Sequence, residues 1–310
     1  MTEHPLDAAS THARWNRALP PRLEIDSGDI VHFECLEAAG GQVHPGISLD
    51  ELSGIDRGRI HSLTGPVLVR GAKPGDVLEI EVLDLTHHGW GYSTVVEGLG
   101  FLKDRFRQPY LFHWDLLPHE TRSLAPAVVP LLPFCGVMGV APRIEGEFRT
   151  RPPGPFGGNM DVRELSAGAR LYLPVFSPGA LFSCGDGHAA QGDGEVCING
   201  IECPLDATLR FHLHPGNTIS GPLIESAQPR SIASDSWIVV ESDADPLRAA
   251  RNATSRMVDL LVRLWGFSEI HAYILCSVAM HLRLSQVVNE PMITVSAAIA
   301  KSILPERRLF

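Results

Sequence analysis

The stretch Asp76-Val77-Leu78-Glu79-Ile80-Glu81-Val82-Leu83-Asp84-Leu85 decides the class of fold. At the start of this run, branched apolar residues alternate with glutamates, so one side of an extended chain is apolar and the other is charged. Such a strand is typical of an antiparallel sheet with one buried face and one wet face. The preceding turn contains Pro74 and Gly75, which favour a tight reversal of the chain.

Most of the remaining chain is predicted to form short strands between turns, in keeping with its 29 glycines and 24 prolines. The first twenty residues are expected to form an N-terminal segment that is mobile or lies over the surface of the fold. Residues 48–59 are expected to form a loop or short helix. Residues 89–120 are aromatic and rich in glycine, which predicts short strands and long loops. The other predicted strands lie within residues 29–36, 67–70, 128–141, 171–176, 196–202, 207–214, 236–241, 287–288 and 293–295.

Two helices are predicted toward the C-terminal end. Asp245 supplies an N-cap and Pro246 suits the first helical position, so a helix should run to about Trp265 and end at Gly266. A second helix should follow within residues 268–280. The expected fold class is therefore mainly β with added helices, an α+β fold.

Length and composition limit the classes of function. A chain of 310 residues can bury a large core and form one large domain or two intertwined ones. The expected division is a single unit, residues 1–310, with a strand-rich part at 25–145 and a second part at 146–310. The net charge of -10, without a basic stripe, argues against nucleic acid as a partner. No apolar run reaches the ~18 residues needed to cross a bilayer, so no membrane association is expected.

The compartment is inferred from the N-terminal residues and the cysteines. Residues 1–16 carry charges and histidines without an apolar core, so they are not expected to form a secretory signal. The six cysteines are scattered and form no Cys-x-x-Cys pair. Reduced thiols in a cytoplasmic enzyme explain this pattern better than a disulfide framework or a thiolate zinc site.

The densest cluster of chemically active side chains is Gly185-Asp186-Gly187-His188-Ala189-Ala190-Gln191-Gly192-Asp193-Gly194-Glu195. Four glycines weaken regular structure here and favour a backbone that turns sharply around something small. Carboxylates and imidazoles are the groups that bind a divalent cation or transfer protons. The remainder of the chain is interpreted as a scaffold that presents this stretch.

The order of motifs resembles the acetamidase/formamidase family of amide hydrolases. The resemblance extends from about residue 28 to the C-terminus. The motifs that carry it are His61-x-x-Thr64-Gly65-Pro66, Gly71-Ala72-x-Pro74-Gly75-Asp76-Val77-Leu78, Pro133-Phe134-x-Gly136-Val137-Met138-Gly139-Val140-Ala141, Gly157-Gly158-Asn159-Met160-Asp161, Gly179-Ala180-Leu181, the 185–195 stretch with Val196-Cys197 and Ile201-Glu202, Ala272-Tyr273-x-Leu275-x-Ser277, and Gln286-Val287-Val288.

This resemblance implies a strand-rich fold of β-sandwich or barrel-like halves with added helices. It also implies hydrolysis of short linear amides to a carboxylate and ammonia, a divalent metal, and assembly as a homodimer or larger homo-oligomer. The chain departs from the family pattern at a few positions. Ser62 replaces a usual proline, residues 198–200 replace small residues, and His281 and Asn289 stand where aspartates are usual. These changes affect the expected substrate pocket.

Amide hydrolysis needs an activated nucleophile, a stabiliser of the oxyanion and an acid for the departing amine. A cation such as zinc supplies the first two. Asp186 and His188 lie two residues apart, so an extended chain points both to one face. His61 is the best remote nitrogen ligand, because a Gly-Pro turn ends its motif. The hypothesis is that Asp186, His188 and His61 hold the metal and Glu195 is the general base.

Other residues receive supporting roles in this hypothesis. Asp193 would orient a ligand or hold a second cation, and Gln191 or glycine backbone amides would face the oxyanion. Asn159 and Asp161 would bind a second, harder cation such as calcium, or cap their own loop. The plainer alternative for the whole set is a turn whose polar side chains bond to local backbone, with His61 as a hydrogen-bonded structural residue.

Two rival functions remain open from the sequence. The same stretch could belong to a metal-stabilised binding or structural module without turnover, whose site would be closed by protein ligands. Alternatively, Cys184 or Cys197, which bracket the stretch, could attack the amide as a thiolate if a base lowered the thiol pKa. Packing is the simpler role for both cysteines.

Overall fold

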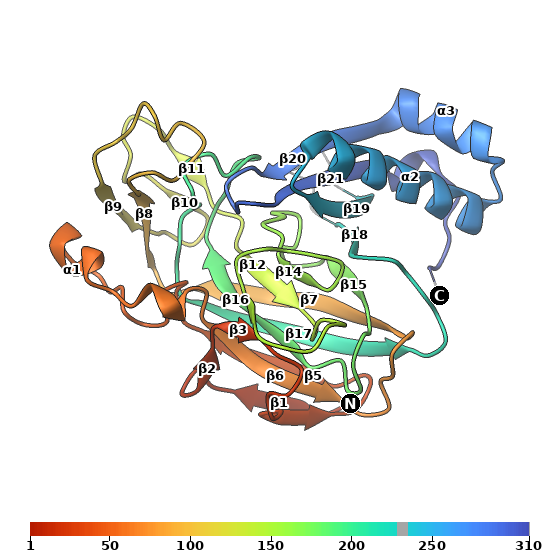
Figure 1. Ribbon diagram of the computed structural model, residues 1–310, viewed down its shortest axis with the longest axis horizontal. Helices are drawn as coiled ribbons and strands as arrows, with labels where there is room; N and C mark the ends of the chain where they lie inside the picture. The colour runs from red at the N-terminus through yellow and green to blue at the C-terminus, as the bar shows by residue number, and fades with distance from the viewer. Residues whose placement is uncertain (228–234, 310) are drawn as a thin grey trace.

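Two large β-sheets pack against each other and carry a pair of helices at one end (Figure 1). The computed structural model describes residues 1–227 and 235–309. The larger sheet has nine strands in the order β1-β5-β17-β7-β15-β18-β19-β21-β20. All its neighbours pair antiparallel except β1 and β5, which run parallel. The strand bounds are β1 Glu3–Leu6, β5 Ile30–Cys35, β17 Leu205–His214, β7 Val77–His87, β15 Arg170–Pro174, β18 Leu223–Glu225, β19 Ser236–Asp243, β21 Ile293–Ala300 and β20 Met280–Gln286.

The second sheet has six strands and lies in the centre of the molecule. Its order is β14-β12-β16-β6-β2, with β4 pairing with β6 in parallel. Three two-stranded pairs, β3 with β13, β8 with β9 and β10 with β11, complete the strands. The bounds are β14 Gly157–Asn159, β12 Phe134–Gly139, β16 Phe182–His188, β6 Leu63–Val69, β2 Thr11–His12, β4 Leu23–Ile25, β3 Arg14–Trp15, β13 Phe148–Arg149, β8 Trp90–Val95, β9 Tyr110–Asp115, β10 Glu120–Thr121 and β11 Val129–Pro130.

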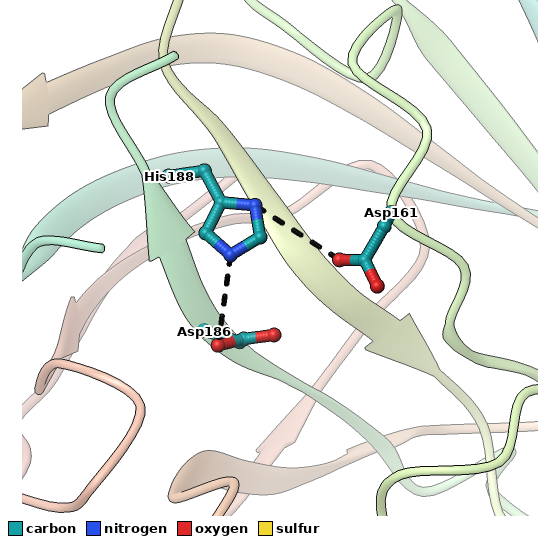
Figure 2. A group of neighbouring side chains, drawn as sticks. All are labelled: Asp161, Asp186 and His188. Atoms are coloured by element: carbon teal, nitrogen blue, oxygen red, sulfur yellow. Dashed lines mark ion pairs between the residues drawn. The ribbon is translucent and has the colours of Figure 1, made fainter. Parts of the chain in front are cut away.

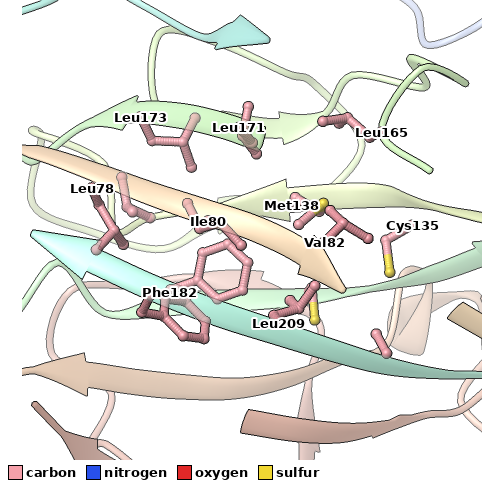
Figure 3. Packing of buried hydrophobic residues seen from close by; sticks show 14 of the residues in the cluster. Leu78, Ile80, Val82, Cys135, Met138, Leu165, Leu171, Leu173, Phe182 and Leu209 are labelled. Carbon is pink, nitrogen blue, oxygen red and sulfur yellow. The ribbon is translucent and has the colours of Figure 1, made fainter. Parts of the chain in front are cut away.

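The main core lies between the two large sheets (Figure 3). The apolar face of β7, predicted from its alternation, contributes Leu78, Ile80 and Val82, all fully buried. Met138 of β12 and Phe182 of β16 meet them from the second sheet. The glutamates that alternate with the apolar residues of β7 lie on the outer face, where they are partly exposed. The alternating pattern therefore specified the side of the sheet that is buried.

The two long helices cover the C-terminal part of the large sheet (Figure 1). Helix α2, Pro246–Trp265, is capped by the Asp245 side chain and ends at Gly266 in the left-handed conformation. Its buried face packs on β19 and β21 and builds a second core with helix α3, Glu269–Ala279. The short helix α1, Leu49–Ser53, and the 3-10 turns η1, Arg57–Arg59, and η2, Lys301–Ile303, complete the elements. The predicted fold class, mainly β with added helices, is confirmed.

Three local predictions were wrong. The first residues form an ordered strand, β1, because their backbone groups pair in parallel with β5, a contact that a short polar segment does not reveal. Residues 196–202, predicted as a strand, form turns and an isolated bridge at Glu202. Residues 287–288 follow the end of β20 rather than forming a strand. The described helices include none that is long and apolar enough to cross a bilayer.

Candidate active site

Strand β16 presents the central pair of the candidate site. Asp186 and His188 project from this strand, which lies between β12 and β6 in the second sheet. Both side chains are buried. On the neighbouring strand, Gly136 leaves the space that they need: a Cβ there would lie 2.8 Å from Asp186 Oδ2 and 2.5 Å from Asp161 Oδ1. The glycine of this motif is therefore required by the close approach of two carboxylates.

Asp161 completes a group of three around the imidazole (Figure 2). Its Oδ1 lies 3.9 Å from His188 Nδ1, while Asp186 Oδ1 lies 3.9 Å from His188 Nε2. One ligand atom from each residue falls within 4.8 Å of the others. Asn289 donates a hydrogen bond from its side-chain amide to Asp161 Oδ2, so Oδ1 is the oxygen that faces the site.

A second group of three contains the same histidine. His188 Nε2 lies 2.8 Å from Glu202 Oε1, and Glu195 places a carboxylate oxygen within 4.8 Å of both. Glu202 is held by backbone pairing with Tyr92, through hydrogen bonds of 2.9 Å in each direction. Glu195 has a φ of +48°, an uncommon conformation for a side chain of this size. His188 is therefore surrounded by four carboxylates.

His61 reaches the cluster from the start of β6. Its Nε2 lies 3.9 Å from Asp186 Oδ2, and its Nδ1 is buried without a hydrogen-bond partner. Burial lowers the pKa of His61 to about 4, since the charged imidazolium loses its hydration. The neutral ring has a free nitrogen lone pair at ordinary pH, which is the form that coordinates metals.

The buried carboxyl groups are costly in the ionised form. Burial raises the pKa of Asp161 to about 6. Burial, followed by the charges of neighbouring carboxylates, also raises the pKa values of Asp186 and Glu195 well above their usual range. Burial lowers the pKa of His188, but the charge of Glu202 and the other carboxylates outweighs it, and the net shift is well upward. A positive charge at the centre of the site would relieve this repulsion.

The hydrogen-bond inventory supports the same conclusion. In the described part of the chain, several buried polar atoms have no hydrogen-bond partner, and five of them belong to this cluster. A buried polar atom without a partner costs free energy unless an ion or water satisfies it. Two imidazoles and four carboxylates are suitable donors for a divalent cation such as zinc. The atoms concerned are Asp161 Oδ1, His188 Nδ1, Glu195 Oε2, Glu202 Oε2 and His61 Nδ1.

The structure brings four of the six predicted site residues together: Asp186, His188, His61 and Glu195. Asp193 lies at the edge, where its side chain is one-third exposed and forms ion pairs with Arg283 and Arg163. Gln191 donates its side-chain amide to the backbone oxygens of Asp161 (3.0 Å) and Ser285 (3.3 Å), so this amide supports the loop instead of pointing to a free space.

Sequence reasoning gave no role to Glu202 and assigned Asp161 either to a second cation site or to capping its own loop. The structure places Asp161 in the same cluster as Asp186, while Asn159 is buried beside it in β14. The motif Ile201-Glu202 was the one signal that could have identified Glu202. The backbone of Glu202 pairs with that of His188 in an isolated β-bridge, which brings the two side chains together. The two residues are 14 positions apart, and no local sequence pattern predicts such pairing.

The cysteines lie outside the cluster. Cys184 is fully buried in the core near Cys35 and Cys135, and burial raises its pKa well above the usual value. Cys197 is exposed, and its sulfur lies 3.5 Å from the backbone oxygen of Thr94. Partial desolvation of the thiol raises the pKa of Cys197 as well. Neither residue meets the requirement of an activated thiolate.

Comparison with known proteins agrees with the fold. The model of the Acetamidase/Formamidase family matches residues 2–147 and 144–306. An acetamidase from Bacillus halodurans is 32% identical, with a TM-score of 0.89 over 96% of this chain and 98% of that one. A protein described as a predicted acetamidase/formamidase from Thermoanaerobacter tengcongensis is 29% identical, with a TM-score of 0.90 over 98% and 97%. The acetamidase of Mycolicibacterium smegmatis is 25% identical over 86% of this chain and 85% of its own.

These matches cover nearly the whole chain and include the strands that carry the cluster. The family match and the related amidases define a hydrolase of amide C–N bonds. The chain belongs to the acetamidase/formamidase family.

Proposed function

We propose that this enzyme hydrolyses a small linear carboxamide, of the formamide or acetamide type, to a carboxylate and ammonia with water activated at a divalent cation. The observation that carries the proposal is the set of buried donors around His188, several of which have no hydrogen-bond partner. The names of the related proteins, acetamidases and a formamidase, agree with this class of substrate.

Asp186, His188 and His61 are the proposed cation ligands, and Asp161 and Glu202 are within reach of the same position. Zinc is the proposed ion, because nitrogen and oxygen donors are present without thiolates. When bound, such an ion lowers the pKa of water and polarises a carbonyl oxygen. The four segments that carry these five residues meet only in the folded chain, so the ligand set depends on the packing of the second sheet.

Glu195 is the proposed general base. Its side chain is buried, and one carboxylate oxygen lacks a hydrogen-bond partner. Burial raises the pKa of Glu195, which makes its carboxylate a stronger base for taking a proton from water and returning it to the departing amine. Asp161, whose carboxyl group interacts with that of Glu195, would help to hold the proton between these two steps.

The assembly and location of the enzyme belong to the same proposal. The chain is proposed to act as one catalytic unit, residues 1–310, in a homodimer or larger homo-oligomer. A cytoplasmic location is supported by six cysteines that all remain free thiols.

The test is ammonia release from formamide, acetamide and larger amides by purified enzyme, before and after chelation and after return of zinc. We expect release by the metal-loaded enzyme, loss on chelation, and a decrease in kcat of ~100-fold or more in Glu195→Gln. Glu241→Gln, which alters a partly buried glutamate paired with Arg256, is the matched control. A metal-loaded protein that releases no ammonia from any amide would show a binding module instead.

A further inference from the structure

The side chain of Arg283 joins two segments that each carry an acid of the candidate site. Arg283 lies on β20, the last strand of the nine-stranded sheet, and only 8% of its side chain is exposed. Its Nη1 lies 2.8 Å from Glu164 Oε1, and its Nε and Nη2 both bond to the carboxylate of Asp193, with an Nε distance of 3.0 Å. One guanidinium therefore binds two carboxylates, one of them through two hydrogen bonds.

The positions of these two carboxylates in the chain give the contact its importance. Asp193 precedes Glu195 by two residues, and Glu164 follows Asp161 by three residues. Asp161 and Glu195 interact with each other inside the site. Arg283 contacts neither, and its own contacts lie outside the cluster of donors. It fixes the spacing of the two segments from the edge of the site.

Two other side chains also hold this segment. Arg163 Nε lies 3.3 Å from Asp193 Oδ1, and Gln191 donates to the Asp161 and Ser285 carbonyls. Two further contacts are between backbone groups. The Gly194 N–H donates to the Ser285 carbonyl at 3.2 Å, and the Val287 N–H donates to the Gly194 carbonyl at 3.1 Å. These backbone bonds restrain the path of the chain. The orientation of the turn relative to β20 depends on the side-chain contacts. Because the backbone bonds persist when Arg283 is altered, the sheet should still form in such a variant.

We propose that Arg283 is a positioning residue that orients Glu195 toward Asp161 by holding Asp193 and Glu164 on one guanidinium. This inference rests on the proposed function, since it assigns Arg283 to the base of that reaction. The proposal also gives Asp193 a role: its carboxylate is the group through which Arg283 holds the turn. Neither residue touches the substrate or the cation in this scheme.

The variants Arg283→Gln, Arg283→Lys, Asp193→Asn and the double variant Asp193→Asn/Arg283→Gln test the proposal. Arg256→Gln is the control, because Arg256, on helix α2, is also largely buried, binds Glu241 of the large sheet at 2.6 Å and is not part of the site. Bound metal, kcat, KM and backbone hydrogen exchange in peptides covering residues 189–203 are measured for each folded variant.

We expect Arg283→Gln to lower kcat by ~10- to 100-fold, as small misplacements of catalytic groups do, with KM within about threefold and bound metal unchanged. Arg283→Lys should recover part of kcat, and the double variant should be no slower than Arg283→Gln, because both changes remove one interaction. Exchange at residues 189–203 should be faster in Arg283→Gln but not in Arg256→Gln.

Two results would overturn the inference: a kcat in Arg283→Gln within about twofold of wild type, or unchanged exchange in the loop. If the wild-type enzyme itself releases no ammonia, the proposed function fails separately. The exchange measurement then still decides whether Arg283 holds the loop, since it does not depend on turnover.

Discussion

Gly136→Ala is expected to remove cation binding and activity together, although the change adds a single methyl group. The added Cβ would lie 2.5 Å from Asp161 Oδ1, 2.8 Å from Asp186 Oδ2 and 3.1 Å from the Asp186 backbone oxygen. Ordinary contact begins near 3.4 Å, so the two carboxylates must retreat by about 0.9 and 0.6 Å. Neither can do so freely, because Asn289 binds Asp161 and strand pairing fixes the Asp186 backbone.

The expected magnitude follows from that displacement. A shift approaching 1 Å in a catalytic group costs roughly 100-fold in rate, and overpacking a buried position costs ~1–3 kcal/mol of stability. Metal content by elemental analysis, ammonia release and thermal unfolding measure the three effects separately. The control is Gly192→Ala, since an added Cβ at Gly192 meets nothing within 4 Å and Gly192, like Gly136, lacks a positive φ.

Wild-type metal content and kcat in a folded Gly136→Ala protein would refute the reasoning. That result would mean that the two carboxylates do not need their present separation, and that the proposed ligand set is incorrect. Equal damage in Gly192→Ala would also count against it, because the loss would then come from the glycine-rich backbone in general.

Three further predictions concern single residues. In chelator-treated protein, Asp161→Asn should raise the free energy of unfolding at pH 8 by up to about 3 kcal/mol and change it little below pH 4. The reason is that burial raises the pKa of Asp161 from 3.8 to about 6. Below pH 3.8 the carboxyl group is neutral in the folded and the unfolded chain, and the neutral amide of the variant replaces it with little change. As the pH rises through 6, the folded wild-type protein loses stability because it must ionise a buried group, and the variant does not; urea unfolding at both pH values checks this. Asn289→Asp should destabilise the metal-free protein at pH 8 by ~1.5–3 kcal/mol, measured in the same way, because a hydrogen bond to Asp161 is replaced by repulsion; an unchanged midpoint would contradict it. Cys184→Ser should keep kcat for ammonia release within about twofold, since Cys184 is a core residue; loss of turnover in folded protein would restore the thiolate alternative.

The parts of the fold that could be predicted are those whose signals are local. Helix α2 was located by Asp245 and Gly266, which lie at its two ends, and β7 by the alternation within its own residues. Asp186 and His188 were recognised as a pair because two residues on one strand share a face. Each of these predictions needed only one short stretch of sequence.

The parts that could not be predicted depend on contacts between distant segments. Asp193 was assigned to the chemistry because it lies in the same loop as Glu195. Its partner in the structure, Arg283, is 90 residues away in the sequence. Glu202 was missed because its position beside His188 depends on pairing with Tyr92. The partner of a single acidic residue cannot be predicted from the neighbouring sequence when that partner lies on a distant segment.

The two halves of the site are supported in different ways, and this difference predicts how substitutions will act. Asp186 and His188 lie on a central strand that pairs on both sides, so their positions change only if the second sheet is distorted. Glu195 lies in a turn that is held against the edge strand β20 by backbone bonds, the Gln191 amide and the Arg283 guanidinium. Changes beneath the central strand, as at Gly136, should therefore remove the metal, whereas changes at the edge, as at Arg283, should leave the metal bound and slow the proton transfers. If a variant at Arg283 lost metal and turnover in equal measure, the positions of the metal ligands and of Glu195 would not be independent.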